Sequence, residues 1–235
     1  MALPVINTAK YETTIPSTGR AVEYRPYLVK EEKILMIALE SQDQKAILRA
    51  VKDVIESCVF DDMDVDNLAI FDVESLFLAL RSKSVGESVD VNIKCKECDG
   101  ENQHTIILED IKVPEVGEMD KNIMITEDVG VSMRYPSFTD MEKVENEDLQ
   151  TVRGVMDLIT NCIDSVYDKD TIYKSSDQTQ KELMDFVDNL NSEQFQKMSD
   201  WFEAMPTLKS TVEFDCISCK ETNVQELRGL QSFFT

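Results

Sequence analysis

Two Cys-x-x-Cys pairs carry the clearest chemical signal in this chain. The first runs from Cys95 to Cys98 and the second from Cys216 to Cys219. Two thiolates three residues apart on a tight turn can bind one ion while backbone N–H groups stabilise their charge. Four such thiolates fill a tetrahedral shell and leave no position open for a substrate. We therefore expect Cys95, Cys98, Cys216 and Cys219 to hold a structural zinc ion.

The spacing leaves other chemistries open. The 117 residues from 99 to 215 separate the two pairs, so this is not a compact zinc ribbon. Metal-free dithiols, disulfides, redox chemistry and an iron–sulfur cluster are the alternatives. His104, the only histidine, gives a Cys-x2-Cys-x5-His spacing with the first pair, but we expect it to face solvent on a strand. Gly100 suits a tight turn after Cys98, whereas Glu221 is a poorer fit at the same place in the second pair.

Each pair follows an alternating apolar run that predicts a β-strand. The expected strands are 88–94 and 103–109 around the first pair, and 209–215 before the second. An asparagine lies four residues beyond each pair, Asn102 and Asn223. A thioredoxin-type redox motif instead opens a helix, whose N-terminus lowers a thiol pKa. The position at strand ends therefore favours a metal knuckle.

The cysteine pairs are part of a longer internal similarity between the two halves of the sequence. Residues 24–33 are similar to 134–143, and residues 51–58 are similar to 155–162; the cysteine pairs follow in the same order. Three matches in one order favour a duplicated unit of about 100–120 residues. We predict a helix-rich α+β fold built from two diverged copies of a helical unit, each ending in a β-hairpin with a Cys-x-x-Cys knuckle.

Apolar residues at helical spacing predict seven helices, and their distribution predicts the domain division. In the first expected helix, Ile34, Leu35, Ile37 and Ala38 point inward. The expected helices are 29–41, 43–58, 72–83, 138–147, 149–166, 179–189 and 192–204. The expected division is an extended N-terminal arm at 1–20, a first repeat unit at 21–112, connecting strands at 113–133 and a second repeat unit at 134–235.

Composition excludes several classes of partner. The formal net charge is −22, which argues against nucleic acid and anionic membrane surfaces because both are negatively charged. An acidic surface suits a basic protein partner, although carboxylates also simply coat exposed helices. The sequence has no apolar run long enough for a transmembrane helix and no apolar signal segment in residues 1–20, so six cysteines are expected in a reducing cytoplasm.

Two aromatic pairs are candidates for contact with a partner protein. Trp201 and Phe202 lie near the end of the last expected helix, and Phe233 and Phe234 lie close to the end of the chain. Such pairs either anchor a tail on the core or bind a partner protein. We predict Trp201, Phe202, Phe233 and Phe234 as candidate partner-binding residues.

The N-terminal sequence resembles a known family. Residues 15–19, Ile-Pro-Ser-Thr-Gly, and residues 22–35, which begin Val-Glu-Tyr-Arg-Pro-Tyr-Leu-Val-Lys, are similar to the baseplate hub proteins of T-even-type contractile-tailed phages. That family contains hub subunits and a related hub assembly chaperone. The resemblance implies a role in tail assembly in the host cytoplasm, either as a virion subunit of the hub or as a helper, with other hub proteins as partners. The prediction of a metal site comes from the cysteine pairs of this sequence and not from the resemblance.

Two functional classes remain. The first is a non-catalytic assembly or structural protein whose two repeat units are stapled by the four-cysteine metal site. The alternative is a thiol redox or metal-dependent enzyme, for which Cys95 between Lys94 and Lys96 is the best nucleophile because cations lower a thiol pKa. No phosphate-binding glycine motif is present, and a single histidine beside a cysteine pair builds no convincing catalytic triad.

Overall fold

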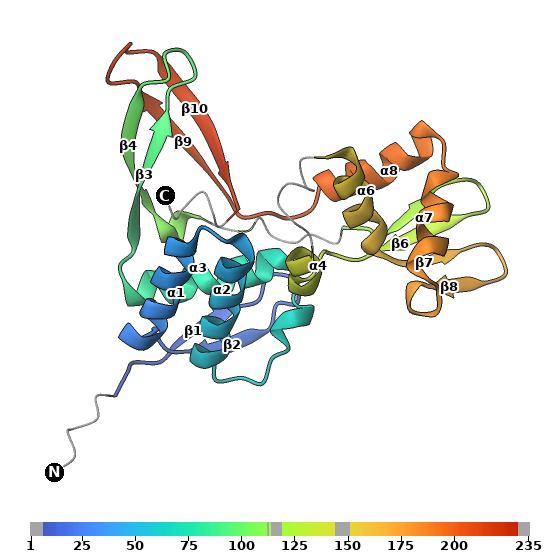
Figure 1. Ribbon diagram of the computed structural model, residues 1–235, viewed down its shortest axis with the longest axis horizontal. Helices are drawn as coiled ribbons and strands as arrows, with labels where there is room; N and C mark the ends of the chain where they lie inside the picture. Colours follow the sequence, from blue (N-terminus) through green and yellow to red (C-terminus); the bar gives the residue numbers. More distant parts are fainter. Residues whose placement is uncertain (1–6, 112, 114–118, 144–150, 230–235) are drawn as a thin grey trace. The chain divides into compact units, whose positions relative to one another are not determined.

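The computed structural model forms two compact units that interleave along the chain (Figure 1). The structure describes residues 7–111, 113, 119–143 and 151–229. Unit 1 comprises Met1–Val65, Phe71–Val116 and Pro206–Thr235, and unit 2 comprises Asp66–Ile70 and Gly117–Met205. The predicted division placed the second cysteine pair with residues 134–235, whereas the residues from Pro206 group with unit 1. Among the described residues, no helix combines the length and apolarity needed to cross a membrane.

Unit 1 begins with a hairpin and three helices. These elements are β1 (Tyr11–Thr14), β2 (Ala21–Tyr24), α1 (Val29–Ser41), α2 (Gln44–Cys58) and α3 (Ile70–Ser84). Between α2 and α3, the 3₁₀ turn Val65–Asn67 leads into the short segment Asp66–Ile70, which groups with unit 2. Asp43 caps α2, because its side chain accepts a hydrogen bond from the backbone N–H of Lys45. Val54, Ile55 and Cys58 form the fully buried face of α2, at the spacing of residues on one side of a helix. Strand β1 lies within the predicted N-terminal arm and pairs with β2.

Helix α1 buries a narrower face than predicted. Leu35 and Ala38 are each 8% exposed, as expected, but Ile34 is 43% exposed and Ile37 is 67% exposed. The prediction that all four point inward was therefore half wrong. The physical reason is that α1 packs against α2 along one side (Figure 1), and an apolar stripe of two residues is enough for that contact. The other apolar side chains of α1 remain on the surface.

Two β-hairpins, each with one Cys-x-x-Cys pair at its turn, lie side by side in unit 1 (Figure 1). Their strands are β3 (Ser88–Lys94), β4 (Glu101–Ile107), β9 (Lys209–Asp215) and β10 (Thr222–Arg228), and a 3₁₀ turn at Leu108–Asp110 follows β4. The alternation in β3 buries Val89, Val91 and Ile93. These side chains form one apolar cluster with residues of the second hairpin, including Leu208 and Val212. This shared core holds the two hairpins together below their turns.

Unit 2 packs helices on a four-stranded antiparallel sheet. The strand order is β5 (Asn122–Met124), β6 (Gly130–Met133), β7 (Ile163–Tyr167) and β8 (Ile172–Lys174). The helices are α4 (Phe138–Lys143), α6 (Val152–Asn161), α7 (Gln180–Asp188) and α8 (Ser192–Glu203), with a 3₁₀ turn at Ser175–Asp177. Strands β5 and β6 fall in the predicted connecting strands. Val131, Ile159, Ile163 and Met198 lie at the centre of the core.

The helix expected at 149–166 is shorter than predicted. Thr151 caps α6 by accepting a hydrogen bond from the backbone N–H of Gly154, and the helix ends at Asn161. From Ile163 the burial alternates, and this segment pairs with β6 and β8 as β7. Ile163 and Val166 lie within the range expected to be helical, but they are β-branched residues that fit a pleated sheet between two partner strands. Residues 149 and 150 lie outside the described residues, as do residues 144–147 of the helix expected at 138–147.

An arginine in unit 1 closes the junction between β2 and the end of α2. The backbone N–H of Arg25 donates to the carbonyl of Cys58 at 3.0 Å. Its guanidinium donates to the carbonyl of Ser57 at 2.9 Å and to the Glu31 carboxylate at 2.9 Å. Glu31 also accepts from the backbone N–H of Leu28, so a carboxylate that is 2% exposed is fully engaged.

Unit 2 contains the same arrangement around a second arginine. The backbone N–H of Arg134 donates to the carbonyl of Cys162 at 2.8 Å, and its guanidinium donates to the carbonyl of Asn161 at 2.6 Å. The guanidinium also binds Asp140, which accepts from the backbone N–H of Ser137 at 2.8 Å. In the structure, Arg25 corresponds to Arg134. The alignment of residues 24–33 with 134–143 instead places Tyr24 opposite Arg134, so the two correspondences differ by one residue.

Candidate metal centre

The four predicted cysteine sulfurs meet at the tips of the two hairpins. All four Sγ atoms lie within 4.8 Å of one another. The Sγ atoms of Cys95 and Cys219 are 3.6 Å apart, and so are those of Cys98 and Cys216. Each of these close pairs joins one hairpin to the other. All four are free thiols, so what brings them together is the arrangement of the hairpins and not a covalent bond.

Both cysteine turns have the same local structure. In the first, the backbone N–H of Cys95 donates to the carbonyl of Gly100 at 2.9 Å, and the N–H of Asp99 donates back to the carbonyl of Cys95 at 3.0 Å. Asp99 has φ 54°, the left-handed conformation that closes the turn. We call residues 95–100 the first knuckle.

The second knuckle, residues 216–221, repeats these contacts. The N–H of Cys216 donates to the carbonyl of Glu221 at 3.0 Å, the N–H of Lys220 donates to the carbonyl of Cys216 at 2.9 Å, and Lys220 has φ 67°. Glu221 therefore occupies the position of Gly100, and only its backbone is needed for the turn. The sequence-based concern that Glu221 fits the knuckle poorly does not apply.

Gly100 has a different reason to lack a side chain. A Cβ atom built on Gly100 would lie 2.9 Å from the Oγ of Ser218 and 3.2 Å from the Sγ of Cys98. Both distances are shorter than ordinary contacts. A side chain at Gly100 would therefore require the Ser218 hydroxyl to turn away, and the Ser218 Cβ and the Cys98 sulfur to give by a few tenths of an ångström.

Two asparagines cross between the knuckles. The Oδ1 of Asn223 accepts a hydrogen bond from the backbone N–H of Lys96 at 2.9 Å. In the opposite direction, the Oδ1 of Asn102 accepts from the backbone N–H of Ile217 at 2.8 Å. Both asparagines are 4% exposed. Each knuckle is thus fastened to an asparagine on the strand that follows the other knuckle.

The first sulfur of each pair lies in a site that favours a thiolate. Cys95 is 1% exposed and Cys216 is 0% exposed. N–H groups on the turn lower the pKa of Cys216 to about 6, with the N–H of Cys219 first among them. Burial opposes ionisation of Cys95, but the N–H groups of Glu97 and Cys98 and the amide of Asn223 lower its pKa overall. Negative charge at these two sulfurs is already stabilised by the protein.

The second sulfur of each pair lies at the surface and prefers the thiol form. The N–H of Glu221 favours ionisation of Cys219, but desolvation and three neighbouring sulfurs raise its pKa to about 12. The pKa of Cys98 is also raised, since the turn N–H does not fully offset the proximity of Cys216 and Cys95. Four sulfurs this close cannot all ionise without a cation between them, because their charges repel.

A tetrahedral metal ion satisfies these requirements. Zn–S bonds of about 2.3 Å place the sulfurs of a regular tetrahedron about 3.8 Å apart. The two measured separations of 3.6 Å are close to this value. The donors are four cysteine sulfurs, which soft and borderline ions such as Zn²⁺ prefer. The residues present therefore fit a closed, structural metal site that Cys95, Cys98, Cys216 and Cys219 would hold.

The other predicted site residues lie elsewhere. His104 is on β4 opposite Val91 and is not part of the sulfur cluster. Trp201 is 7% exposed, stacks on Tyr135 at 5.7 Å and donates its indole N–H to the carbonyl of Asp120. Phe202 packs, partly buried, against the same core. Phe233 and Phe234 lie outside the described residues, and a partner-binding role for the four aromatic residues stays a prediction.

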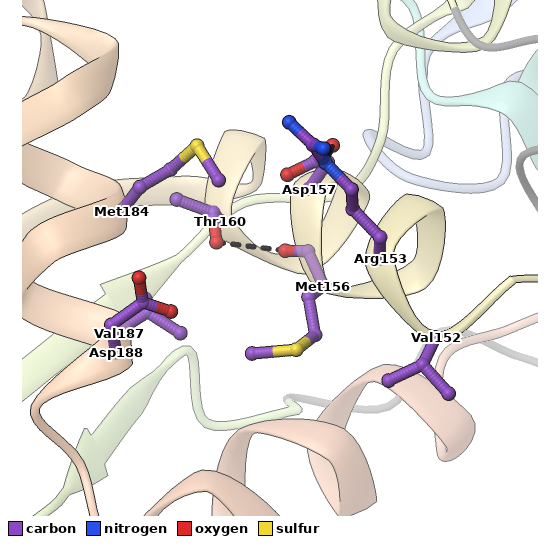
Figure 2. A pocket seen from close by; sticks show the side chains of 8 residues that line it. All are labelled: Val152, Arg153, Met156, Asp157, Thr160, Met184, Val187 and Asp188. Carbon is purple, nitrogen blue, oxygen red and sulfur yellow. Dashed lines mark hydrogen bonds and ion pairs between the residues drawn. The ribbon is translucent and has the colours of Figure 1, made fainter.

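A pocket of about 490 Å³ lies between α6 and α7 in unit 2 (Figure 2). Met156 and Met184 extend toward it from the two helices, and Asp157 and Asp188 add carboxylates. The hydroxyl of Thr160 is engaged with the carbonyl of Met156 at 2.7 Å. The residues that line this pocket include neither histidine nor cysteine.

Sequence reasoning located the four sulfurs but missed what holds the knuckles together. The available signal was the pair of asparagines at matching positions, Asn102 and Asn223. Their side chains cross from one hairpin to the other, and that relation depends on which strands become neighbours. One sequence does not reveal the partner of a buried amide.

Comparisons with known proteins agree with the resemblance seen at the N-terminus. Residues 8–235 match the model of the family described as T4 bacteriophage base plate protein. No curated protein and no solved structure matches the chain. Since the family model extends from β1 to the end of the chain, and so includes both units and both knuckles, the chain belongs to the T4 bacteriophage base plate protein family.

Proposed function

We propose that this protein is a component or assembly factor of the phage baseplate hub, and that a zinc ion bound by the two knuckles staples its fold. The observation that carries the first part is the family match over residues 8–235. Its role is non-catalytic: the protein supplies surfaces on which other hub proteins assemble. It acts in the host cytoplasm during baseplate construction, and as a hub subunit it would remain in the virion.

The four-sulfur cluster supports the staple. The metal would join two segments of chain separated by more than a hundred residues, both belonging to unit 1. Structural zinc contributes on the order of 10 kcal/mol to folding in small zinc peptides. A closed tetrathiolate site also suits a protein that needs a rigid scaffold, because no coordination position is left for substrate.

The surface is suited to binding other proteins. The net charge of −22 favours association with basic partner surfaces. On α1, Val29, Met36 and Ile37 are each more than half exposed, which adds apolar area outside the core. The repeated arginine arrangements at Arg25 and Arg134 support descent of the two halves from one duplicated unit.

The thiol-enzyme alternative has weaker support. A redox nucleophile must be both exposed and readily ionised. Cys95, the nucleophile that the sequence favoured, is 1% exposed, and the exposed Cys98 has a raised pKa. Each sulfur in the cluster thus lacks one of the two properties.

Mass spectrometry of mature particles tests the assignment and separates its two forms. Stoichiometric presence in purified tails supports a hub subunit. An assembly factor would be absent from particles. In that case, host cells infected with a phage whose gene for this protein is deleted should accumulate unassembled hubs. Normal hubs in that infection would contradict both forms of the proposal.

A further inference from the structure

We propose that Asn102 and Asn223 are positioning residues that lock the two knuckles together and gather the four sulfurs before a metal ion binds. This inference deepens the proposed metal staple. It concerns residues that lie outside the ligand set, and its first test does not depend on metal.

The lock consists of the buried side-chain amides of Asn102 and Asn223. Each amide donates a hydrogen bond within its own hairpin and accepts one from the other hairpin. The Nδ2 of Asn223 donates to the carbonyl of Glu221 at 2.9 Å, within its own knuckle. Its Oδ1 accepts from the backbone N–H of Lys96 at 2.9 Å, across the gap. The same Nδ2 lies 3.3 Å from the Sγ of Cys95. One side chain therefore fixes its own turn, the opposite turn and the opposite buried sulfur.

Asn102 makes the reciprocal set of contacts. Its Nδ2 donates to the carbonyl of Gly100 at 2.8 Å and lies 3.7 Å from the Sγ of Cys216. Its Oδ1 accepts from the N–H of Ile217 at 2.8 Å. None of these contacts involves a metal ion. The two asparagines therefore relate the knuckles to each other whether or not an ion is present.

The flanking contacts reinforce the first half of the lock. Lys96 donates from Nζ to the carbonyl of Val224 at 2.7 Å, and the side chain of Gln225 also bonds across to the carbonyl of Lys94. Buried polar groups that are fully satisfied favour one arrangement over its alternatives, because any shift leaves an amide unpaired. The apolar cluster below the knuckles brings the hairpins together, and the asparagines fix the position of one knuckle relative to the other.

The first test measures amide exchange in the metal-free protein. The full chain is reduced, stripped with a chelator and studied by hydrogen exchange resolved to single residues. We expect the backbone N–H groups of Lys96 and Ile217 to be protected, and Asn223→Ala to remove the protection of Lys96. Rapid exchange of both groups in the wild-type protein would overturn the proposal.

The second test measures zinc affinity by competition with a chromogenic chelator. We expect Asn102→Ala and Asn223→Ala each to bind Zn²⁺ about 10–100-fold more weakly, the usual effect of losing a group that orients ligands. Asn92→Ala is the matched control, because Asn92 is exposed on β3 of the same hairpin. Equal affinities in all three variants would contradict the positioning role.

The two tests separate the lock from the staple. If the wild-type protein binds no zinc but the N–H of Lys96 is protected and depends on Asn223, the staple fails and the lock stands. If zinc binds through four sulfurs but the asparagine variants behave as Asn92→Ala does, the lock fails and the staple stands. Should an alanine variant not fold, the exchange of the wild-type protein decides.

Discussion

The sulfur of Cys98 lies 3.6 Å from the sulfur of Cys216, although 118 positions separate the two residues. The contact joins the tips of two hairpins that share an apolar core at their base and two crossing asparagines near their turns. In the function proposed above, four thiols in this position would hold a metal ion that fastens one hairpin of unit 1 to the other.

The six cysteines should divide into two accessible and four protected thiols. With zinc bound, we expect slow reaction of all six with a thiol reagent. After chelation the exposed Cys98 and Cys219 should react, whereas the buried Cys58, Cys95, Cys162 and Cys216 should not until the protein unfolds. Cys58 and Cys162 are 0% exposed, and burial raises the pKa of Cys58 to about 11 and that of Cys162 to about 12. A timed thiol assay checks this, and six equally fast thiols after chelation would contradict it.

Gly100→Ala should weaken metal binding because the new Cβ would crowd Ser218 and the Cys98 sulfur. Glu221→Ala changes the matching position of the second knuckle, where only the backbone carbonyl is used, and should leave affinity unchanged. Absorption spectra of the Co²⁺-loaded proteins, read at the sulfur-to-cobalt bands, compare the two. Equal titration curves would mean that the knuckles are not as closely apposed as described.

Replacing the carboxylate that pairs with Arg25 or with Arg134 should destabilise the fold, and the effect should be larger in unit 1. Glu31→Gln should cost about 2–3 kcal/mol, because both side chains of the Arg25–Glu31 pair are largely buried. Asp140→Asn should cost less, about 1–2 kcal/mol, because the Arg134 side chain is 37% exposed and water screens the charge left behind. Urea unfolding measures both, and the reverse order would contradict the account.

The contribution of Glu31 should depend on pH. Burial alone would raise its pKa, but hydrogen bonds from Arg25, the N–H of Leu28 and Lys30 lower it overall. A lowered folded-state pKa stabilises the protein above the unfolded value of about 4.3, and this contribution is lost as the pH falls through the folded value.

The stability difference between wild type and Glu31→Gln should therefore be constant above about pH 5 and should shrink below about pH 4. Taking the difference cancels any loss of metal in acid, which affects both proteins. Urea unfolding at several pH values checks this. A difference that grows on acidification would show that the sign is wrong.

Sequence patterns predicted the parts of this fold that depend on local periodicity. Residues 209–215 form β9 and residues 29–41 form α1, as expected, because alternation and helical spacing are properties of neighbouring residues. The extent of burial was harder to predict. Ile37 continues the apolar pattern of α1 but is 67% exposed, since no second surface covers that side among the described residues.

Contacts between distant segments decided the rest. Ile163 fits a helical stripe in the sequence, yet it lies on β7 because β6 and β8 supply partner strands on both sides. The four cysteines were predictable because their chemistry demands convergence. The crossing bonds of Asn102 and Asn223 were not, since an amide side chain has many possible partners and the choice follows from how the hairpins pack.

X-ray absorption at the zinc edge, on intact protein purified under reducing conditions, tests the central claim most directly. The account predicts one zinc ion per chain, surrounded by four sulfur atoms at about 2.3 Å, and loss of that signal in Cys216→Ser. A folded, reduced protein that contains no metal, or a zinc ion bound mainly by nitrogen and oxygen, would contradict it.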